Sequence, residues 1–432
     1  MHTLSMNYGF GRLSFALPKR ALLGAWSLGS VPVKTANSPS EWLADAVQQL
    51  SAAGFEHALK GKRLGLLLAD GTRAWDPDLL LSALGPHLGL AQEVKAILCT
   101  GTHDPGSPEN RALGQRVLRQ LKRQCTHPSL HIHGAETDAH RLHGVTKRGT
   151  RVEICALADA CDLFLVLSDM KHHYFAGYSN PLKYYLPGMA SLESARGNHS
   201  LALEPGAELG HHPWHAEPLK RANPVAQDML EAFQMVLGER EHFALTTISA
   251  GGVGSDLRWA GAGRTQEVTR RGMQVVDQQA SLSIPAARFL VVSAGGAPHD
   301  ESLYTVQRAL EMSRAAVCDG GEVLFLAACT NGIGSERARR NFYEPLTAPL
   351  EEIAAPTRAE YKLYSHKPVK FAQLIKRLER LHLHSELSDE CVRAMHMHPC
   401  AEPQRVIDGW LPRLQPGEGI AFLDDASKLA IR

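Results

Sequence analysis

The feature that most constrains the fold of this chain is a recurring alternation of short apolar runs with longer amphipathic segments. The apolar runs have the length of buried strands and occupy residues 64–68, 94–99, 163–167, 289–293 and 322–327. Helical spacing of apolar residues is found over 39–54, 79–90, 109–124, 223–237, 303–316 and 371–381. Short continuous apolar runs between helices are typical of parallel strands that are covered on both faces. The sequence therefore predicts an α/β fold with largely parallel sheets.

The same alternation suggests how the chain divides into domains. We expect residues 1–280 to form an N-terminal α/β domain and residues 285–415 a smaller C-terminal one, because a new alternation begins near Pro285. Residues 416–432 are expected to form terminal strands that pack back on the N-terminal domain. The glycine run at 251–254 lacks the full dinucleotide-binding spacing, so it predicts only a tight turn.

Charge, hydropathy and cysteine content exclude several classes of partner. The chain has 46 Lys and Arg against 45 Asp and Glu, so its formal net charge of +1 favours neither nucleic acid nor an anionic membrane. No apolar run has transmembrane length, and the N-terminus lacks a signal pattern. Eight cysteines without a CxxC motif indicate free thiols. We therefore expect a cytoplasmic protein with no nucleic-acid or membrane partner; the sequence specifies no oligomeric state.

Histidine is unusually frequent, with 22 residues in the chain. Many of these histidines occur in two loose groups whose spacings match no zinc motif. We expect most of them to be solvated, with adventitious metal binding as the lesser alternative. The groups are His127, His131, His133, His140 and His143, and His382, His384, His396 and His398.

Polar residues directly follow three of the predicted strands. Asp70-Gly71-Thr72-Arg73 follows the first, Gly101-Thr102-His103 the second, and the segment with His173 and Lys183 the third. A doubly wound sheet would bring these strand ends to one crevice, where ligands usually bind. An arginine there can hold a carboxylate or phosphate through two parallel hydrogen bonds. The alternatives are a plain Asp-Gly turn at residues 70–71 and a surface loop over residues 172–183.

Taken together, these motifs resemble the nickel-pincer lactate racemase family over nearly the whole chain. The order of the motifs and the spacing of His173, Lys183 and His199 are specific, whereas any single motif would mean little. The matching segments are residues 70–73, 101–103, 173–179, Lys183, 186–188, 198–199, 295–296, 361–363 and 366–367.

The resemblance implies a fold and a cofactor. It implies two α/β domains with the active site in the cleft between them. The implied cofactor is pyridinium-3,5-bisthiocarboxylic acid mononucleotide, the nickel-pincer nucleotide, which grips nickel through two sulfur-containing arms and one ring carbon. Lys183 would anchor this nucleotide covalently, and His199 would be the fourth nickel ligand. The proteins that synthesise the cofactor are implied partners.

The resemblance also implies the reaction, which is inversion of carbon 2 of a small-molecule 2-hydroxy acid by hydride transfer to and from the cofactor. His103 and His173 would be the two acid/base residues, a role that suits histidine because its ordinary pKa lies near neutrality. By the same resemblance, Asp70 and Arg73 would contact the cofactor. Arg73, Tyr304 and Arg308 would contact the substrate.

The chain departs from the family pattern at several positions. Asn180-Pro181-Leu182 stands where Gly-Gly-Arg is common, and Asp104 where an arginine is usual. Thr305 and Arg308 stand where the lactate enzymes have Gln and Lys. We therefore expect a substrate other than lactate, either larger or with a second carboxylate.

Two alternatives to the racemase interpretation stay open. The first is a protein of the same fold that has lost or altered its cofactor and acts as a small-molecule- or nucleotide-binding protein, or as a different enzyme. The second is a zinc-type hydrolase built on the histidine-rich sequence, although the ligand spacing for it is missing.

Overall fold

The computed structural model describes residues 1–31, 37–73, 75–249 and 257–432. The chain divides into two compact units: unit 1 comprises Met1–Pro32 and Gln279–Arg432, and unit 2 comprises Val33–Gln278. None of the described helices is both long and apolar enough to span a bilayer. The tight turn predicted at residues 251–254 lies outside the described residues.

Unit 2 is built on a six-stranded sheet with the strand order β13-β12-β9-β4-β5-β6. Strand β13 is antiparallel to β12, and the other neighbours pair in parallel. The central strands β4 and β9 are buried over nearly their whole length, as the apolar runs predicted. The strands are β4 (Arg63–Ala69), β5 (Glu93–Cys99), β6 (Pro128–Ile132), β9 (Leu163–Asp169), β12 (Glu241–Ser249) and β13 (Leu257–Arg264).

The order in which the chain visits this sheet creates a switch point. The chain enters at β4 and moves outward through β5 and β6, then returns to the other side of β4 as β9 and continues through β12 and β13. Strand order therefore reverses between β4 and β9, and ligands of such sheets bind at the carboxyl ends of the strands beside that point. Asp70 follows β4 and His173 follows β9 at this same edge of the sheet.

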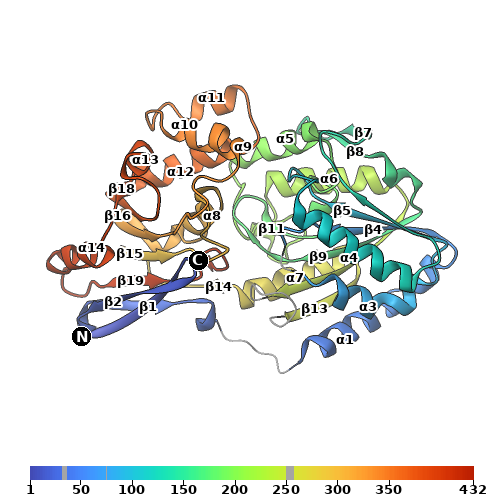
Figure 1. The fold of residues 1–432 in the computed structure, drawn as a ribbon, viewed down its shortest axis with the longest axis horizontal. Coiled ribbons are helices and arrows are strands. Elements are labelled where there is room, and N and C mark those ends of the chain that lie inside the picture. Colours follow the sequence, from blue (N-terminus) through green and yellow to red (C-terminus); the bar gives the residue numbers. More distant parts are fainter. Residues whose placement is uncertain (32–36, 74, 250–256) are drawn as a thin grey trace. The chain divides into compact units, whose positions relative to one another are not determined.

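Two groups of helices and two small hairpins complete unit 2 (Figure 1). Helix α1 packs on β13 and α3, and α3 packs on α4, which contacts β6. Helix α6 contacts α5, β7, β8 and the short turn η4 (Pro181–Tyr184). Helix α1 begins with Ser38 in a capping box with Glu41. These elements are α1 (Pro39–Ala52), α2 (Phe55–Leu59), α3 (Pro77–Leu88), α4 (Pro108–Gln124), α5 (Leu192–Ser200), α6 (Pro224–Leu237), α7 (Thr265–Gln279), β7 (His140–Val145), β8 (Arg151–Cys155), β10 (Lys171–His173) and β11 (Gly177–Ser179).

Unit 1 contains a second six-stranded sheet, with the order β18-β17-β16-β15-β19-β3 and every neighbour parallel. Its strands are β3 (Leu22–Trp26), β15 (Ala287–Ser293), β16 (Val317–Leu326), β17 (Arg380–His384), β18 (His398–Pro399) and β19 (Ile420–Leu423). Two pairs lie outside that sheet: β1 (His2–Tyr8) with β2 (Gly11–Leu17), and β14 (Ser281–Leu282) with β20 (Ala430–Ile431). The helices are α8 (Leu303–Met312), α9 (Glu336–Ala338), α10 (Glu344–Leu346), α11 (Ala354–Ala359), α12 (His366–Arg377), α13 (Asp389–Ala394) and α14 (Pro403–Trp410).

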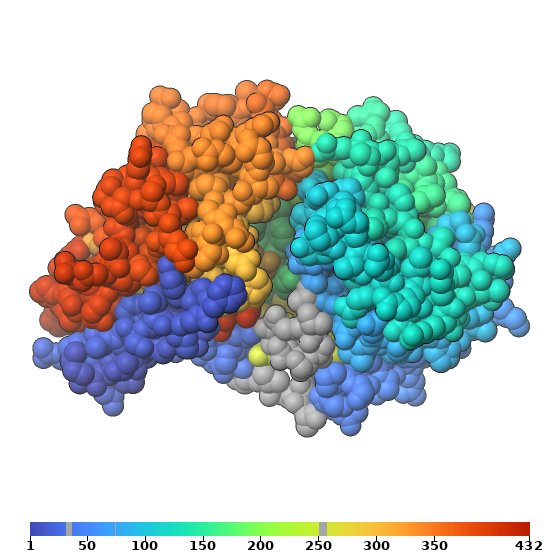
Figure 2. All heavy atoms as spheres, in the orientation of Figure 1, coloured from blue at the N-terminus to red at the C-terminus, as the bar shows by residue number. Residues whose placement is uncertain are grey.

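The make-up of unit 1 corrects the domain boundaries predicted from the sequence. Strand β3 pairs with β19, so the N-terminal residues belong with the C-terminal part of the chain and not with a domain of residues 1–280. Strand β19 also pairs with β15, so residues 416–432 complete this unit instead of packing back on the N-terminal domain. Phe15 of the β1–β2 hairpin shares a core with Phe289 and Trp410. Figure 2 shows the N-terminal residues, in dark blue, against the orange and red C-terminal residues.

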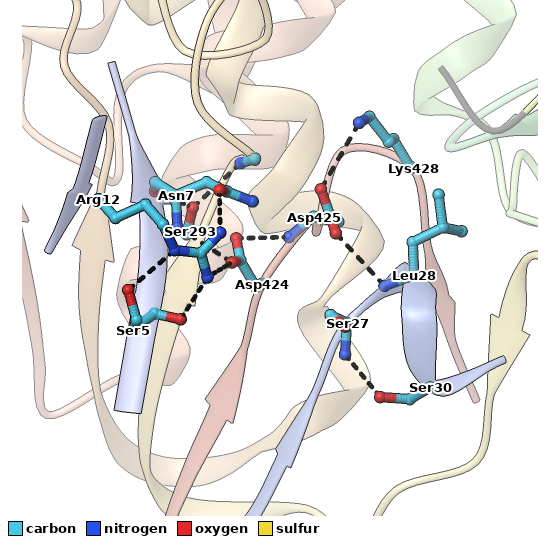
Figure 3. Close-up of polar contacts among 11 residues, drawn as sticks. Ser5, Asn7, Arg12, Ser27, Leu28, Ser30, Ser293, Asp424, Asp425 and Lys428 are labelled. Atoms are coloured by element: carbon cyan, nitrogen blue, oxygen red, sulfur yellow. Dashed lines mark hydrogen bonds and ion pairs between the residues drawn. The ribbon is translucent and has the colours of Figure 1, made fainter. Parts of the chain in front are cut away.

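A pocket of about 200 Å³ in unit 1 is lined by residues of β1, β3 and β19 and by the residues that follow β19. Its polar groups form hydrogen bonds and ion pairs with one another (Figure 3). Arg12 donates to the hydroxyl of Ser5, and Asp424 accepts the backbone N–H of Asn7 at 3.0 Å. Because these contacts satisfy the pocket's own groups, we interpret them as fastening the β1–β2 hairpin to β19.

Candidate functional site

The first group of predicted site residues lies at the ends of β4 and β5. Asp70 is 2% exposed, and its Oδ2 lies 2.6 Å from Nδ1 of His103. Its Oδ1 accepts a hydrogen bond from the Thr72 hydroxyl at 2.7 Å and lies 3.9 Å from Nε of Arg73. Burial alone would raise the pKa of Asp70, but the His103 hydrogen bond and the nearby positive charges outweigh it, so the pKa is lowered. Asp70 is therefore an ionised carboxylate that orients His103.

This contact assigns the proton of a neutral His103 ring. A carboxylate only accepts hydrogen bonds, so Nδ1 of His103 must be the donor, and the lone pair then lies on Nε2. The His103 side chain is 36% exposed, so Nε2 lies on an accessible part of the site. A histidine held in this way by an aspartate is suited to act as a general base.

His173 lies on the small hairpin of β10 and β11, where it pairs with Gly177. The backbone N–H of Ala176 donates to Nδ1 of His173 at 3.3 Å. Nδ1 is therefore the acceptor, and a neutral ring carries its proton on Nε2. The structure thus assigns opposite tautomers to His103 and His173, one with a basic Nε2 and one with a donating Nε2.

The hairpin depends on a glycine at position 177. Its φ is +73°, and an added Cβ would lie 1.7 Å from the carbonyl oxygen of His211. We expect Gly177→Ala to lower the free energy of unfolding by about 2–4 kcal/mol, because overlap with backbone adds to the cost of the left-handed conformation. Urea denaturation measures this change. Gly149→Ala is the matched control, since Gly149 has a φ of +85° with nothing near its added Cβ; a cost of only about 1 kcal/mol is expected there. An equal loss of unfolding free energy at the two positions would contradict the close contact between residue 177 and the carbonyl oxygen of His211.

Lys183 lies on η4, which is built by the segment that departs from the family pattern. The Asn180 side chain accepts the N–H of Leu182 at 2.8 Å and donates to the carbonyl of Tyr178 at 3.1 Å. Pro181 takes the first position of the turn, where a backbone N–H has no partner within the turn. Asn180-Pro181-Leu182 therefore forms a capped turn that positions Lys183 without the glycines.

Phe175 connects three of the predicted residues. Its ring centroid lies 4.5 Å from that of His173, 5.4 Å from that of His199 and 5.9 Å from Nζ of Lys183. His199 comes from the last turn of α5. Burial and the nearby Lys183 lower the pKa of His199 to about 3, although a hydrogen bond to the Ala195 carbonyl acts in the opposite direction. His199 is therefore a neutral imidazole, which is the form that binds metals.

A backbone contact joins these two groups of residues. The N–H of Gly101, in the loop that carries His103, donates to the carbonyl of Gly188 at 2.9 Å. The N–H of Gly188 in turn donates to the carbonyl of Lys183 at 2.8 Å. The structure thus places the six predicted residues of unit 2 on adjoining segments beyond the ends of the strands: Asp70, Arg73, His103, His173, Lys183 and His199.

The two predicted substrate contacts of the C-terminal part, Tyr304 and Arg308, lie on α8 in unit 1. Nζ of Lys367 lies 3.7 Å from the centroid of the Tyr304 ring and donates to the Tyr304 carbonyl at 2.7 Å. Burial and the charge of Arg308 lower the pKa of Lys367 to about 7, while Glu311 acts in the opposite direction. The sequence pointed to Lys367 only as part of a matching segment, because a buried lysine has no signature beyond its apolar neighbours. The substrate roles of Tyr304 and Arg308 stay predictions.

Comparisons with known proteins agree with the resemblance seen in the sequence. A family model described as the lactate racemase N-terminal domain matches residues 8–210. A lactate racemase of Thermoanaerobacterium thermosaccharolyticum is 24% identical over 350 residues, which are 80% of this chain and 78% of that protein. A lactate racemase of Lactiplantibacillus plantarum is 22% identical over 248 residues, 56% of this chain and 54% of that protein.

Two solved structures share the fold. The lactate racemase apoprotein from T. thermosaccharolyticum aligns over 100% of both chains with a TM-score of 0.81 and 21% identity. A protein from Thermotoga maritima aligns over 91% of this chain and 97% of its own, with a TM-score of 0.64 and 14% identity.

Proposed function

We propose that this chain is an isomerase that racemises or epimerises carbon 2 of a 2-hydroxy acid. A family model described as the lactate racemase N-terminal domain matches residues 8–210, and the chain shares its fold with a lactate racemase apoprotein. The observation that carries this proposal is the pair of histidines held in opposite tautomers, His103 by Asp70 and His173 by Ala176. Inversion needs a base for the proton of the substrate hydroxyl and a hydrogen-bond donor that holds the same oxygen, and Nε2 of His103 and Nε2–H of His173 would take these two roles.

The residues around Phe175 fit the cofactor that the resemblance implies. Nickel binds imidazole and sulfur donors well, and a single neutral imidazole is what a ligand with three donors of its own requires. His199 would be that imidazole, and the Lys183 amine, which also lies near the Phe175 ring, would be the covalent anchor. Arg73 would hold anionic groups of the nucleotide or the substrate carboxylate, and Asp70 would fix its neighbour His103. When bound, the nucleotide supplies a hydride acceptor for the hydrogen on carbon 2.

The chain's own residues would take up and return the proton of the substrate hydroxyl. Nε2 of His103 would take the hydroxyl proton of one enantiomer, and Asp70 would stabilise the imidazolium that results. Nε2–H of His173 would donate a hydrogen bond to the same substrate oxygen. As the opposite enantiomer forms, the His103 imidazolium would return the proton to the same oxygen, so no proton is gained or lost overall. The proteins that make the nucleotide would be its partners in the cell.

The residues of α8 and α12 support a substrate with a second carboxylate. Arg308 stands where the lactate enzymes have a lysine, and Lys367, which belongs to a segment that matches the family, lies close to it. The planar guanidinium of Arg308 can bind a carboxylate through two parallel hydrogen bonds, which the lysine cannot do. We therefore propose a 2-hydroxy diacid as the preferred substrate class.

The depressed pKa of Lys367 gives this proposal a pH dependence. The ammonium form binds anions, and with a pKa of about 7 it is lost as pH rises through neutrality. Between pH 6 and 8 we expect KM for a 2-hydroxy diacid to rise roughly tenfold, the effect of losing about 1.4 kcal/mol of binding. Initial rates at several pH values measure it.

Two variants show whether the pH dependence of KM comes from Lys367. Lys367→Gln should have the high KM at every pH. Lys376→Gln on the exposed side of the same helix should behave like the parent protein. A KM that does not vary with pH in the parent would contradict the role of Lys367.

The activity itself is tested by chiral chromatography of single-enantiomer 2-hydroxy acids, incubated with protein made in cells that also express the cofactor-synthesis proteins. Formation of the opposite enantiomer is the expected result. Unchanged enantiomers across mono- and diacids, from protein that carries nickel, would refute the proposed racemisation.

A further inference from the structure

A cluster of metal-ligating side chains lies in unit 2, apart from the residues discussed above. His131 lies on β6, Asp138 in the turn that follows, and Cys155 at the end of β8. Among the described residues this is the one group of three found with all ligand atoms within 4.8 Å of one another. Nε2 of His131 lies 2.6 Å from Oδ2 of Asp138, and the Cys155 thiol donates to the same oxygen at 3.7 Å.

The backbone already holds these residues in place. The N–H of Gly134 donates to Oδ2 of Asp138 at 3.1 Å, and the N–H of Asp138 donates to the Gly134 carbonyl at 2.9 Å. The N–H of Cys155 donates to the carbonyl of Met189 at 2.8 Å. A ligand that binds here therefore has little backbone to order, which favours affinity.

The donor set suits zinc and its neighbours among the transition metals. An imidazole nitrogen, a carboxylate oxygen and a thiolate sulfur are common zinc ligands, with metal–ligand distances of about 2.0–2.3 Å. A tetrahedral ion at such distances separates its ligand atoms by about 3.3–3.8 Å. The Cys155–Asp138 separation of 3.7 Å already meets this requirement, and His131 and Asp138 need to move apart by about 1 Å. All three ligand atoms lie within 4.8 Å of one another.

Asp138 is already in the form that binds a cation, whereas Cys155 must lose its proton first. Burial would raise the pKa of Asp138, but hydrogen bonds from His131 and Gly134 outweigh it and lower the pKa, so the carboxylate is ionised. Burial raises the pKa of the Cys155 thiol to about 11, so the thiol keeps its proton until an ion displaces it.

Two further histidines adjoin the cluster. His140 pairs with Cys155 across the β7–β8 hairpin, so both side chains point to the same face. Nε2 of His133 lies 3.3 Å from Nε2 of His140, and burial lowers the pKa of His133 to about 4. His133 is fully buried, so it is an exception to the expectation that most of these histidines are solvated. His140 is the candidate for a fourth ligand.

We propose that His131, Asp138 and Cys155 bind one divalent transition-metal ion, with zinc as the best-matched ion. On binding, the Cys155 thiol releases its proton to solvent and its sulfur forms a bond to the metal. The ion ties β6 to β8. Strand β8 and the turn after β6 hold the start of α5, since the N–H groups of Ser191 and Leu192 donate to the carbonyls of Glu153 and Ala135. The site would therefore brace the helix that carries His199.

Cobalt titration of the full-length protein, expressed without the cofactor-synthesis proteins, tests this site. A cysteine–cobalt charge-transfer band in the near ultraviolet reports only ions with a thiolate ligand, so cobalt on surface histidines is silent. We expect the band to saturate at one equivalent, to bleach when zinc is added, and to disappear in Cys155→Ser. Cys161→Ser, which changes another buried thiol of unit 2, should keep the band.

Each result of the cobalt titration either supports or refutes the proposed site. No band in the parent protein, or a band that survives in Cys155→Ser, would refute the site. If Cys155→Ser fails to fold, Asp138→Asn replaces it, with an expected loss of cobalt affinity of at least tenfold. Unchanged affinity in Asp138→Asn would equally refute the site. These measurements do not involve racemase activity, so they test the metal site independently of the proposed function.

Discussion

Lys183→Ala is expected to abolish racemisation, with a fall in rate of at least about 10⁶-fold to the uncatalysed level. The reason is that the tethered nucleotide provides the only hydride acceptor in the proposed reaction, so losing it removes the chemistry itself. Nickel bound to the purified protein should fall in parallel, because His199 alone is a single ligand. Chiral chromatography measures the rate, and elemental analysis measures nickel.

Lys183→Arg is the matched variant for this prediction. It keeps a cation beside Phe175 but presents a guanidinium that stays protonated and is a poor nucleophile. If Lys183 acts as a covalent anchor, the arginine variant should be as inactive as the alanine variant, with an unchanged circular dichroism spectrum. Substantial activity in either variant would show that the cofactor is not anchored at this residue.

Asp70→Asn is expected to lower kcat by about 10²–10⁴-fold, the usual contribution of general acid–base catalysis. A neutral amide cannot stabilise the imidazolium of His103 as the buried carboxylate does. KM should change little, because Asp70 acts through His103. Racemisation has an equilibrium constant of one, so kcat/KM must fall equally in the two directions. Initial rates with each enantiomer measure these quantities.

Thr72→Val is the control for Asp70. It removes one hydrogen bond to the carboxylate but leaves the contact with His103, so a loss of less than about tenfold is expected. If Thr72→Val and Asp70→Asn had the same effect, Asp70 would be holding the loop together rather than orienting the base.

Much of the fold followed from local patterns. The buried strands beside the switch point are continuous apolar runs, and the helix caps are short sequence motifs, so both were predictable without knowledge of distant contacts. Element boundaries were less predictable: the helix expected over 371–381 is α12, which ends at Arg377, and Leu381 belongs to β17. Apolar residues near the junction fit both periodicities, so spacing alone could not separate the two elements.

Contacts between distant segments were not predictable. The pairing of β3 with β19 joins residues at opposite ends of the chain, and nothing in either segment specifies the other. The same limit applies to His131, Asp138 and Cys155, which lie on three elements with no motif spacing. At the candidate active site, strand order indicated a shared edge for Asp70 and His103, but their hydrogen bond depends on side-chain rotamers. Asn180-Pro181-Leu182 looked like a defect in the sequence and is a capped turn in the structure.

The central claim is that Lys183 carries a covalent nickel-binding nucleotide. Intact-mass spectrometry tests it most directly, on protein purified from cells that express the cofactor-synthesis proteins. We expect a mass above that of the bare chain by one nucleotide adduct, which peptide mapping assigns to Lys183 and which is missing from Lys183→Ala. The bare mass from the same cells, or an adduct that persists in Lys183→Ala, would contradict the account.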